Sequence, residues 1–440
     1  MTIKLWEPSQ QNIEQANLTA FIQYVNKTYE QTCKTYQDIH AWSILYVAEF
    51  WQACASFCNV QFNTPATDIV DNATAMPGTV WFKGATLNYA QHCLQRRDDT
   101  VALYEVNEAG LQQTLSWNAL YNQVSCWQQF FKEKGIQKGD SVAGVLPNNV
   151  TAITAMLGAT SLGAVWSSCS PDFGEQGICD RLDQIQPKCV VSVAQYLYKG
   201  KTIMLEGRLK DIKDRLKNTK VWVNASEGVL NGWDDLSSVT QYAPTEVEFV
   251  PCGFQDPLFV VFSSGTTGKP KCIVHSVGGT LLQHLKEHRL HCDVKPTDTL
   301  FYYTTCGWMM WNWMVSALAS NIPIVVFDGA ALTATQSIWD LIKDYNITIF
   351  GCSASFVGAS QKRKLNIKDA LSNNTVRLIL STGSPLLPNH YDYLYNAFST
   401  PIQVGSISGG TDIVSCFALS NPLTPVIQGR LQGGGLGMDV

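Results

Sequence analysis

Residues 263–271, which read SSGTTGKPK, place hydroxyl groups, glycines and lysines close together. They directly follow LFVVF at 258–262, an apolar run that is typical of a buried strand. Glycines let backbone N–H groups approach an anion, hydroxyls add hydrogen-bond donors, and lysines add positive charge. Ligands of open α/β sheets bind at the ends of such strands. The segment therefore predicts a loop that holds the phosphates of a nucleotide.

Two other interpretations of this loop are weaker. A Walker A loop, G-x-x-x-x-G-K-[ST], would need glycine where Ser263 stands and a magnesium-binding Ser or Thr where Pro270 stands. An ordinary polar surface loop would not explain why so many anion-binding groups follow a buried strand.

Three later segments follow the loop in this order: TTCGWMMWN at 304–312, STGSP at 381–385 and SISGGTD at 406–412. Together with the loop they resemble the acyl-adenylate-forming superfamily of acyl-CoA synthetases, luciferases and peptide-synthetase adenylation domains. VWFKGATLNYAQH at 80–92 resembles the short-chain acyl-CoA synthetase branch. Two further features resemble the corresponding segments in members of that branch that act on acetoacetate. They are Cys272, within PKCIVHSVGG, and the helical segment 36–52. The resemblance covers residues 36–440.

The resemblance implies an α/β fold: a large N-terminal domain of two α/β subdomains, with mostly parallel sheets flanked by helices. We expect a helical extension and entry loop over 1–88, a first subdomain over 89–245, and a second over 246–440 that carries the phosphate loop. The sequence pattern agrees, because apolar strands alternate with amphipathic helices. The expected helices lie within 18–60 and at 117–135 and 149–163; the expected strands are 141–147, 164–170, 189–194, 257–264, 322–329, 347–353 and 376–385.

Relatives continue into a completed β-barrel part, a hinge and a small C-terminal domain that carries the adenylation lysine. On that resemblance, the 440 residues alone are expected to bind nucleotide weakly and to turn over poorly.

The implied reaction is ATP-dependent activation of acetoacetate, or of a similar short-chain acid such as propionate or hydroxybutyrate, followed by transfer to coenzyme A with release of AMP and pyrophosphate. The implied cofactors and substrates are ATP, Mg²⁺ and coenzyme A. Thr411 would bind the α-phosphate, Asp412 the Mg²⁺, and Lys269 the outer phosphates. The other nucleotide-binding residues implied are Ser263, Ser264, Gly265, Thr266, Thr267, Gly268, Lys271, Gly383, Ser384, Pro385 and Gly410. The implied acyl pocket consists of Trp308, Met309, Met310, Thr382 and Gly409.

Gly409 bears on the choice of acid. Acetyl-CoA synthetases carry a tryptophan at this position, which caps the acyl pocket, so a glycine here would leave room for a longer acid. Selection of acetoacetate over butyrate would also need a hydrogen bond to the keto oxygen, and the sequence does not identify its donor. Trp308, Met309 and Met310 could alternatively belong to the core.

Composition limits the partners. The net charge of −5 gives no reason to expect nucleic acid or an anionic membrane as a ligand, and no apolar run is long enough to span a membrane. The 14 cysteines include no CxxC pair and lie mostly in apolar segments, which favours free thiols in a reducing, cytoplasmic location. Small-molecule substrates are the expected partners, and the oligomeric state is open.

Several alternatives stay open. His275 could touch substrate or be a hydrogen-bonded core residue. His284 and His288 are spaced to share a helix face, which could bind a metal but fits a solvated face better. The acyl group could pass to a carrier-protein thiol or to oxygen instead of coenzyme A, and the chain could be a non-catalytic nucleotide-binding fragment.

Overall fold

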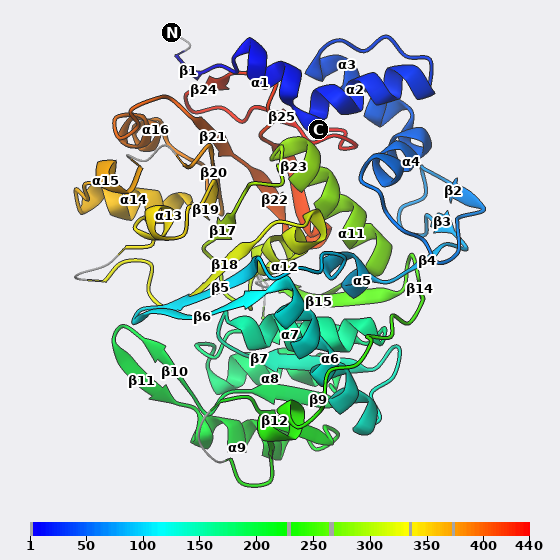
Figure 1. Cartoon of the computed structure of the whole chain (residues 1–440), viewed down its shortest axis with the longest axis vertical. Coiled ribbons are helices and arrows are strands. Elements are labelled where there is room, and N and C mark those ends of the chain that lie inside the picture. The colour runs from blue at the N-terminus through cyan, green and yellow to red at the C-terminus, as the bar shows by residue number, and fades with distance from the viewer. Residues whose placement is uncertain (1–2, 227–229, 264–267, 334–336, 372–374) are drawn as a thin grey trace.

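The computed structural model describes residues 3–226, 230–263, 268–333, 337–371 and 375–440. Two seven-stranded sheets form the centre of the molecule, and helices lie against both (Figure 1). The N-terminal helices lie at one end, beside the last residues of the chain (Figure 1).

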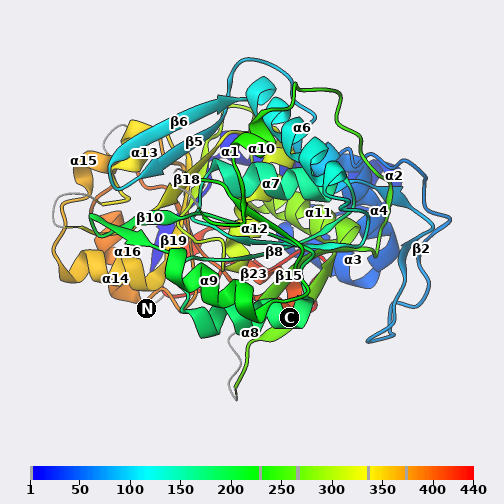
Figure 2. The same cartoon turned by 90° about the horizontal axis from the view of Figure 1, so that it is seen from below.

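The first sheet has the strand order β13-β12-β9-β7-β8-β15-β16 and is parallel except for the final pair. Its strands are β7 (Ser141–Val145), β8 (Val165–Cys169), β9 (Cys189–Ser192), β12 (Val221–Asn224), β13 (Asp234–Asp235), β15 (Pro257–Ser263) and β16 (Lys271–Ser276). Helices α6 (Trp117–Glu133) and α7 (Val150–Ser161) cover one face, and α8 (Glu175–Ile185) and α9 (Glu206–Arg215) cover the other (Figure 2). Because both faces are covered, the strand interiors are almost wholly apolar.

Local sequence explains how α6 and α7 form and pack. Ser116 and Asn149 cap their N-termini by accepting from the N–H groups of Ala119 and Ala152. α7 is buried on nearly every side. A Cβ on Gly158 would lie 2.6 Å from Cβ of Trp127, so the glycine permits the close approach of the two helices.

The second sheet has the strand order β21-β20-β19-β17-β18-β5-β6. Only its edge strand β6 is antiparallel to its neighbour. Its strands are β5 (Val101–Asn107), β6 (Gly110–Ser116), β17 (Leu300–Tyr302), β18 (Ile324–Asp328), β19 (Ile349–Ser353), β20 (Leu378–Thr382) and β21 (Gln403–Ser406). The helices associated with it are α12 (Met309–Val315), α13 (Leu341–Asp344), α14 (Ala354–Lys362), α15 (Lys368–Leu371) and α16 (Pro388–Tyr395).

A smaller sheet near the end of the chain carries the SISGGTD segment. It contains β22 (Ser408–Gly410), β23 (Ser415–Leu419) and β25 (Gly433–Gly434), and a 3₁₀ turn, η3 (Thr411–Ile413), joins its first two strands. Helix α11 (Val277–Lys286) and the π-helical turn η1 (Glu287–His291) that continues it run beside this sheet (Figure 1).

The remaining elements are short or peripheral. They are α1 (Gln10–Gln15), α2 (Asn17–Thr28), α3 (Tyr36–Leu45), α4 (Val47–Phe57), α5 (Tyr89–Cys93), α10 (Ser237–Thr240), the 3₁₀ turn η2 (Ser316–Ser320), and the strand pairs β1 (Lys4–Trp6) with β24 (Val426–Ile427), β2 (Asp68–Val70) with β3 (Trp81–Lys83), β4 (Thr86–Leu87) with β14 (Cys252–Gly253), and β10 (Gln195–Tyr198) with β11 (Lys201–Met204). Within the described ranges, no helix has the length and apolar character needed to cross a membrane.

The expected α/β class and each expected helix and strand are confirmed. The sheets, however, cut across the expected division of the chain at 245/246. β5 and β6 belong to the second sheet although they lie in 89–245, and β15 and β16 complete the first sheet although they lie in 246–440. The boundaries of the three segments therefore stay a prediction.

Candidate active site

The phosphate segment connects the two strands of a hairpin. β15 runs parallel to β8, and β16 returns antiparallel, with Ser263 opposite Lys271. The turn therefore leaves the carboxyl end of a parallel strand, as expected. Gly268 has a φ of 150°, and the carbonyl of Pro270 accepts from Nε2 of Gln184 on α8 at 2.9 Å. Lys269 and Lys271 are exposed, and Ser264, Gly265, Thr266 and Thr267 lie outside the described residues.

The Thr411–Asp412 turn lies against this hairpin. Nε2 of His275, on β16, is 2.7 Å from the carbonyl oxygen of Thr411. A carbonyl can only accept, so this nitrogen carries the proton. The contact joins two segments that are 136 residues apart in the sequence. Asp412 is exposed and Thr411 is half-buried, so both residues are accessible from solvent.

Burial lowers the pKa of His275, although the hydrogen bond to Thr411 and the nearby Asp412 oppose that effect. The neutral imidazole therefore persists at neutral pH, with its proton on the nitrogen that faces Thr411. Within the described structure, His275 positions this turn.

A first pocket, of about 310 Å³, lies on the Gly409 side of the turn. The carboxyl ends of β20 and β21 form it, and Gly383, with a φ of 85°, makes the bend after β20. Its lining includes Thr382, Gly383, Ser384, Pro385, Ser406, Ser408, Gly409 and Arg430. The structure thus brings the STGSP segment and the start of the SISGGTD segment together, and Gly410 links them to Thr411.

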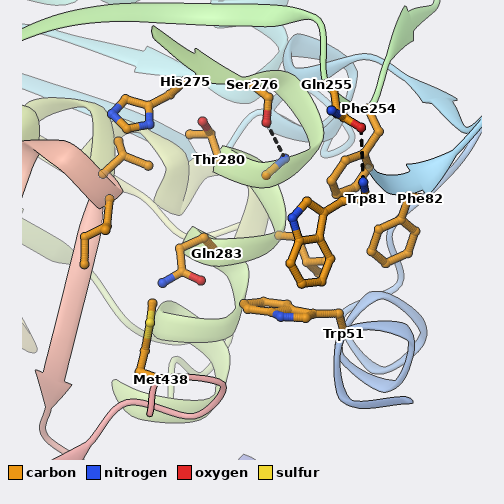
Figure 3. A pocket seen from close by; sticks show the side chains of 14 residues that line it. Trp51, Trp81, Phe82, Phe254, Gln255, His275, Ser276, Thr280, Gln283 and Met438 are labelled. Carbon is orange, nitrogen blue, oxygen red and sulfur yellow. Dashed lines mark hydrogen bonds between the residues drawn. The ribbon is translucent and has the colours of Figure 1, made fainter. Parts of the chain in front are cut away.

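A second pocket, of about 300 Å³, includes in its wall Ile413 and Val414, the two residues after Asp412. Four aromatic residues from distant segments also line it, namely Trp51, Trp81, Phe82 and Phe254, and most of the other lining residues belong to β16 and α11 (Figure 3). Sequence reasoning missed this pocket, because Trp51 and Trp81 lie in the N-terminal extension and show no motif that ties them to the turn.

The interpretation of Gly409 as a vacated tryptophan site is wrong for this backbone. A Cβ on Gly409 would lie 2.0 Å from the carbonyl oxygen of Ser415 and 2.4 Å from Cα of Cys416. The missing side chain would therefore point at the backbone of β23. Glycine is needed here because β22 and β23 approach each other closely, so it does not by itself enlarge an acyl pocket.

The expected acyl-pocket residues separate in the structure. Trp308 is 63% exposed, whereas Met310 is buried in the core and Met309 packs against it. Within the part of the chain that the structure describes, none of the three lines either pocket beside the Thr411 turn. Only Thr382 and Gly409 of the expected set meet, and they do so in the first pocket.

The segment HLKEHRLHC is not a solvated helix face, and that expectation is wrong. His284, Lys286, Glu287, His288 and His291 are all at least 99% buried. Their hydrogen-bond partners lie in segments much later in the chain, such as Val414, Ser420 and Leu436, which the local sequence could not indicate. Among the described residues, no group of three His, Cys, Asp or Glu side chains is placed to hold a metal ion.

These buried groups hold the chain on both sides of the site. Nε2 of His284 donates to the carbonyl of Val414 at 2.7 Å. The Glu287 carboxylate accepts from the Cys416 N–H at 3.2 Å, from the Ser415 hydroxyl, and from Nε1 of Trp313 at 2.8 Å. His275, His284 and Glu287 thus hold the backbone at Thr411, Val414 and Cys416. In each contact the buried imidazole N–H or carboxylate has a hydrogen-bond partner.

The buried histidines predict an acid-sensitive fold. Burial lowers the pKa of His284 to about 4 and that of His291 to about 3, and it also lowers the pKa of His288. An unfolded chain binds protons on these rings below about pH 6.5, whereas the folded chain does not, so stability is complete above pH 6.5 and falls as the pH drops towards 4. His284 alone contributes about 3 kcal/mol to this loss.

We expect the unfolding free energy from urea denaturation to be clearly smaller at pH 4.5 than at pH 7. A His284→Gln variant, which removes one titrating ring, should have a shallower pH dependence. Equal slopes for the two proteins would show that His284 does not contribute.

The fold and the phosphate hairpin agree with the class of protein that the comparisons with known families identify. The AMP-binding enzyme family model matches residues 90–432, and the model for the acetyl-coenzyme A synthetase N-terminus matches residues 36–93. The chain therefore belongs to the AMP-binding enzyme family.

Individual relatives show which members of the family this chain resembles. Acetoacetyl-CoA synthetase of Danio rerio is 39% identical over 454 residues, which cover 99% of this chain and 67% of the relative. Malonamoyl-CoA synthetase of Penicillium aethiopicum is 36% identical over 473 residues, covering 99% and 65%. The solved structure of acetoacetyl-CoA synthetase from Streptomyces lividans superposes with a TM-score of 0.94 at 36% identity, covering 99% of this chain and 69% of that one.

Proposed function

We propose that the protein is an ATP-dependent acid–thiol ligase that activates acetoacetate, or a closely similar short-chain acid, and transfers it to coenzyme A. Enzymes of its family use ATP and coenzyme A. The observation that carries the proposal is the contact between His275 and Thr411, which joins the phosphate hairpin to the Thr–Asp turn beside a pocket.

The reaction has two balanced steps. A carboxylate oxygen of the acid attacks the α-phosphorus of ATP, and the bond to the bridging oxygen breaks, so that pyrophosphate leaves and an acyl-adenylate remains. The thiolate of coenzyme A then attacks the acyl carbonyl, and AMP leaves with the oxygen it received from the acid. The first step needs alignment and charge neutralisation more than proton transfer.

The proposed roles follow the geometry of the turn. The first pocket would hold the adenine, with Gly383, Ser384 and Pro385 beside it. Thr411 would donate to the α-phosphate as charge develops there, and its backbone is held by His275. The residues proposed for the outer phosphates are Ser263, Ser264, Gly265, Thr266, Thr267, Gly268, Lys269 and Lys271.

The chain's own groups fit Mg²⁺ in the way that nucleotide enzymes commonly bind it. One exposed carboxylate, Asp412, lies on the turn, and the described residues offer no complete protein cage. Mg²⁺ usually takes one or two carboxylates and fills its shell with phosphate oxygens and water. Asp412 would hold the ion, which would neutralise phosphate charge.

The relatives' names guide the proposed acid. Acetoacetate and malonamate differ in a methyl and an amino group, but both carry a carbonyl group β to the carboxylate. We therefore propose a 3-oxo acid of this size, with acetoacetate as the first candidate. We also propose a cytoplasmic location, because all 14 cysteines are free thiols.

Acid-dependent exchange of labelled pyrophosphate into ATP tests the first step. We expect acetoacetate to support exchange better than 3-hydroxybutyrate, propionate or acetate, and we expect added coenzyme A to yield the thioester. Exchange without thioester formation would favour a carrier-protein thiol or oxygen as the acceptor. ATP binding without exchange for any acid would leave only a nucleotide-binding protein.

A further inference from the structure

Helix α8 contacts both strands of the phosphate hairpin, β15 and β16, at its base. Cζ of Arg181 lies 5.7 Å from the centroid of the Phe262 ring, and Phe262 is the last residue before the phosphate segment. One turn further along α8, Nε2 of Gln184 donates to the carbonyl of Pro270, which precedes β16, at 2.9 Å. Arg181 therefore lies beside the two ends of the phosphate segment.

A second aromatic contact places Arg181 where the two large sheets meet. Its Cζ lies 4.4 Å from the centroid of the Phe173 ring. That ring lies against the loop that follows β17, because a Cβ on Gly307 would be 2.6 Å from Cζ of Phe173. The Ser168 hydroxyl, near the end of β8, donates to the carbonyl of Cys306 in the same loop at 2.7 Å. The carboxyl ends of β8, β15 and β17 thus meet around Arg181, and ligands of open α/β sheets bind at such ends.

Arg181 has hydrogen-bond donors that no protein group uses. Its Nη1 donates to the carbonyl of Gly177, one turn back on α8, at 2.6 Å. Among the described residues, no carboxylate pairs with the guanidinium, and its Nε and Nη2 make no hydrogen bond and are not closed off from solvent. Arg377, by contrast, is paired with Asp298. A half-buried guanidinium with free donors suits an anionic ligand.

We propose that Arg181 binds the outer phosphates of ATP, and the pyrophosphate that they become. The inference rests on the proposed function and adds to it a residue outside the segments already assigned to the nucleotide. A guanidinium suits this role because its planar set of N–H donors can bind two phosphate oxygens at once. Stacking on Phe173 orients that plane without using the donors. The positive charge stabilises the negative charge that builds up on the leaving pyrophosphate.

Calorimetric titration with Mg²⁺–ATP and with AMP tests this assignment, because AMP lacks the outer phosphates. Arg181→Gln removes the charge and keeps a polar side chain. We expect it to raise the Kd for Mg²⁺–ATP by about 10- to 100-fold and to leave the Kd for AMP within about twofold. Arg181→Lys keeps the charge without the planar fork, so its Kd for Mg²⁺–ATP should lie between those of the parent protein and Arg181→Gln.

Arg215→Gln is the matched control. Arg215 is the last residue of α9 and pairs with Glu175 and Asp183 of α8, so its replacement also removes one positive charge beside this helix. We expect this variant to bind both nucleotides as the parent protein does. Thermal unfolding shows whether each variant is folded.

Equal weakening of Mg²⁺–ATP and AMP binding by Arg181→Gln would overturn the assignment, because it would indicate a structural role. Unchanged binding of both nucleotides would also overturn it, and so would an effect confined to the KM for coenzyme A, since the phosphate contacted would then belong to that substrate. If no acid supports exchange by the parent protein, the proposed function fails. If an acid does and Arg181→Gln binds Mg²⁺–ATP normally, only the role of Arg181 fails.

Discussion

Thr411→Val is expected to lower acid-dependent pyrophosphate exchange by a factor on the order of 10² to 10³ while the protein stays folded. The loss follows from removing a donor that is aimed at charge developing on the α-phosphate, an interaction that is stronger in the transition state than in the ground state. Valine keeps the shape of threonine, and the backbone carbonyl remains available to His275. The fall should therefore appear in kcat more than in the KM for ATP.

Thr411→Ser is the matched control, since it restores the hydroxyl on a smaller side chain. We expect it to recover most of the exchange rate. A Thr411→Val protein that retains more than about a third of the parent rate would mean that this hydroxyl does not take part in adenylation.

The second large effect is expected for Gly409→Ala. The added Cβ would meet the backbone of Ser415 and Cys416 at 2.0 and 2.4 Å. β23 cannot easily retreat, because it pairs with β25 on its other side and Glu287 holds the Cys416 N–H. The strain must displace β22 and the Thr411 turn that follows it, at a cost of about 1–3 kcal/mol.

We expect Gly409→Ala to lower Tm by about 1–3 °C and to reduce exchange about 10²-fold or more with acetoacetate and butyrate alike. Gly410→Ala is the control for stability: its Cβ would be 3.5 Å from the nearest atom, Oδ2 of Asp412, so its Tm should match that of the parent. A Gly409→Ala protein with unchanged Tm would show that β22 and β23 can separate without cost.

Local sequence predicts much of this molecule because its strands are continuous apolar runs. The strands β15 and β20 each lead into a glycine- and hydroxyl-rich segment at their carboxyl ends, so the position of the candidate nucleotide site can be predicted from the sequence alone. The sheet to which a strand belongs depends on contacts with segments far away in the sequence. Nothing within residues 257–276 indicates that β15 and β16 join the sheet of residues 141–224.

Long-range contacts also explain the two errors. The His–Lys–Glu segment looks solvated because its charges have no partners nearby in sequence, whereas their actual partners are Val414, Cys416 and Leu436. The sequence suggests that Gly409 leaves space where a tryptophan side chain would be. A motif comparison does not reveal that a Cβ on Gly409 would point at the backbone of β23. In both cases most of the deciding atoms belong to β23 or to Val414 beside it, which are distant in sequence from the His–Lys–Glu segment.

The most direct test of the account follows one oxygen atom. The protein would be incubated with ATP, coenzyme A and acetoacetate labelled with ¹⁸O in the carboxylate, and the products would be analysed by mass spectrometry. Attack on the α-phosphorus predicts that each AMP carries one ¹⁸O atom and that pyrophosphate carries none. Unlabelled AMP, or ¹⁸O in pyrophosphate or inorganic phosphate, would contradict an acyl-adenylate formed at the Thr411 turn.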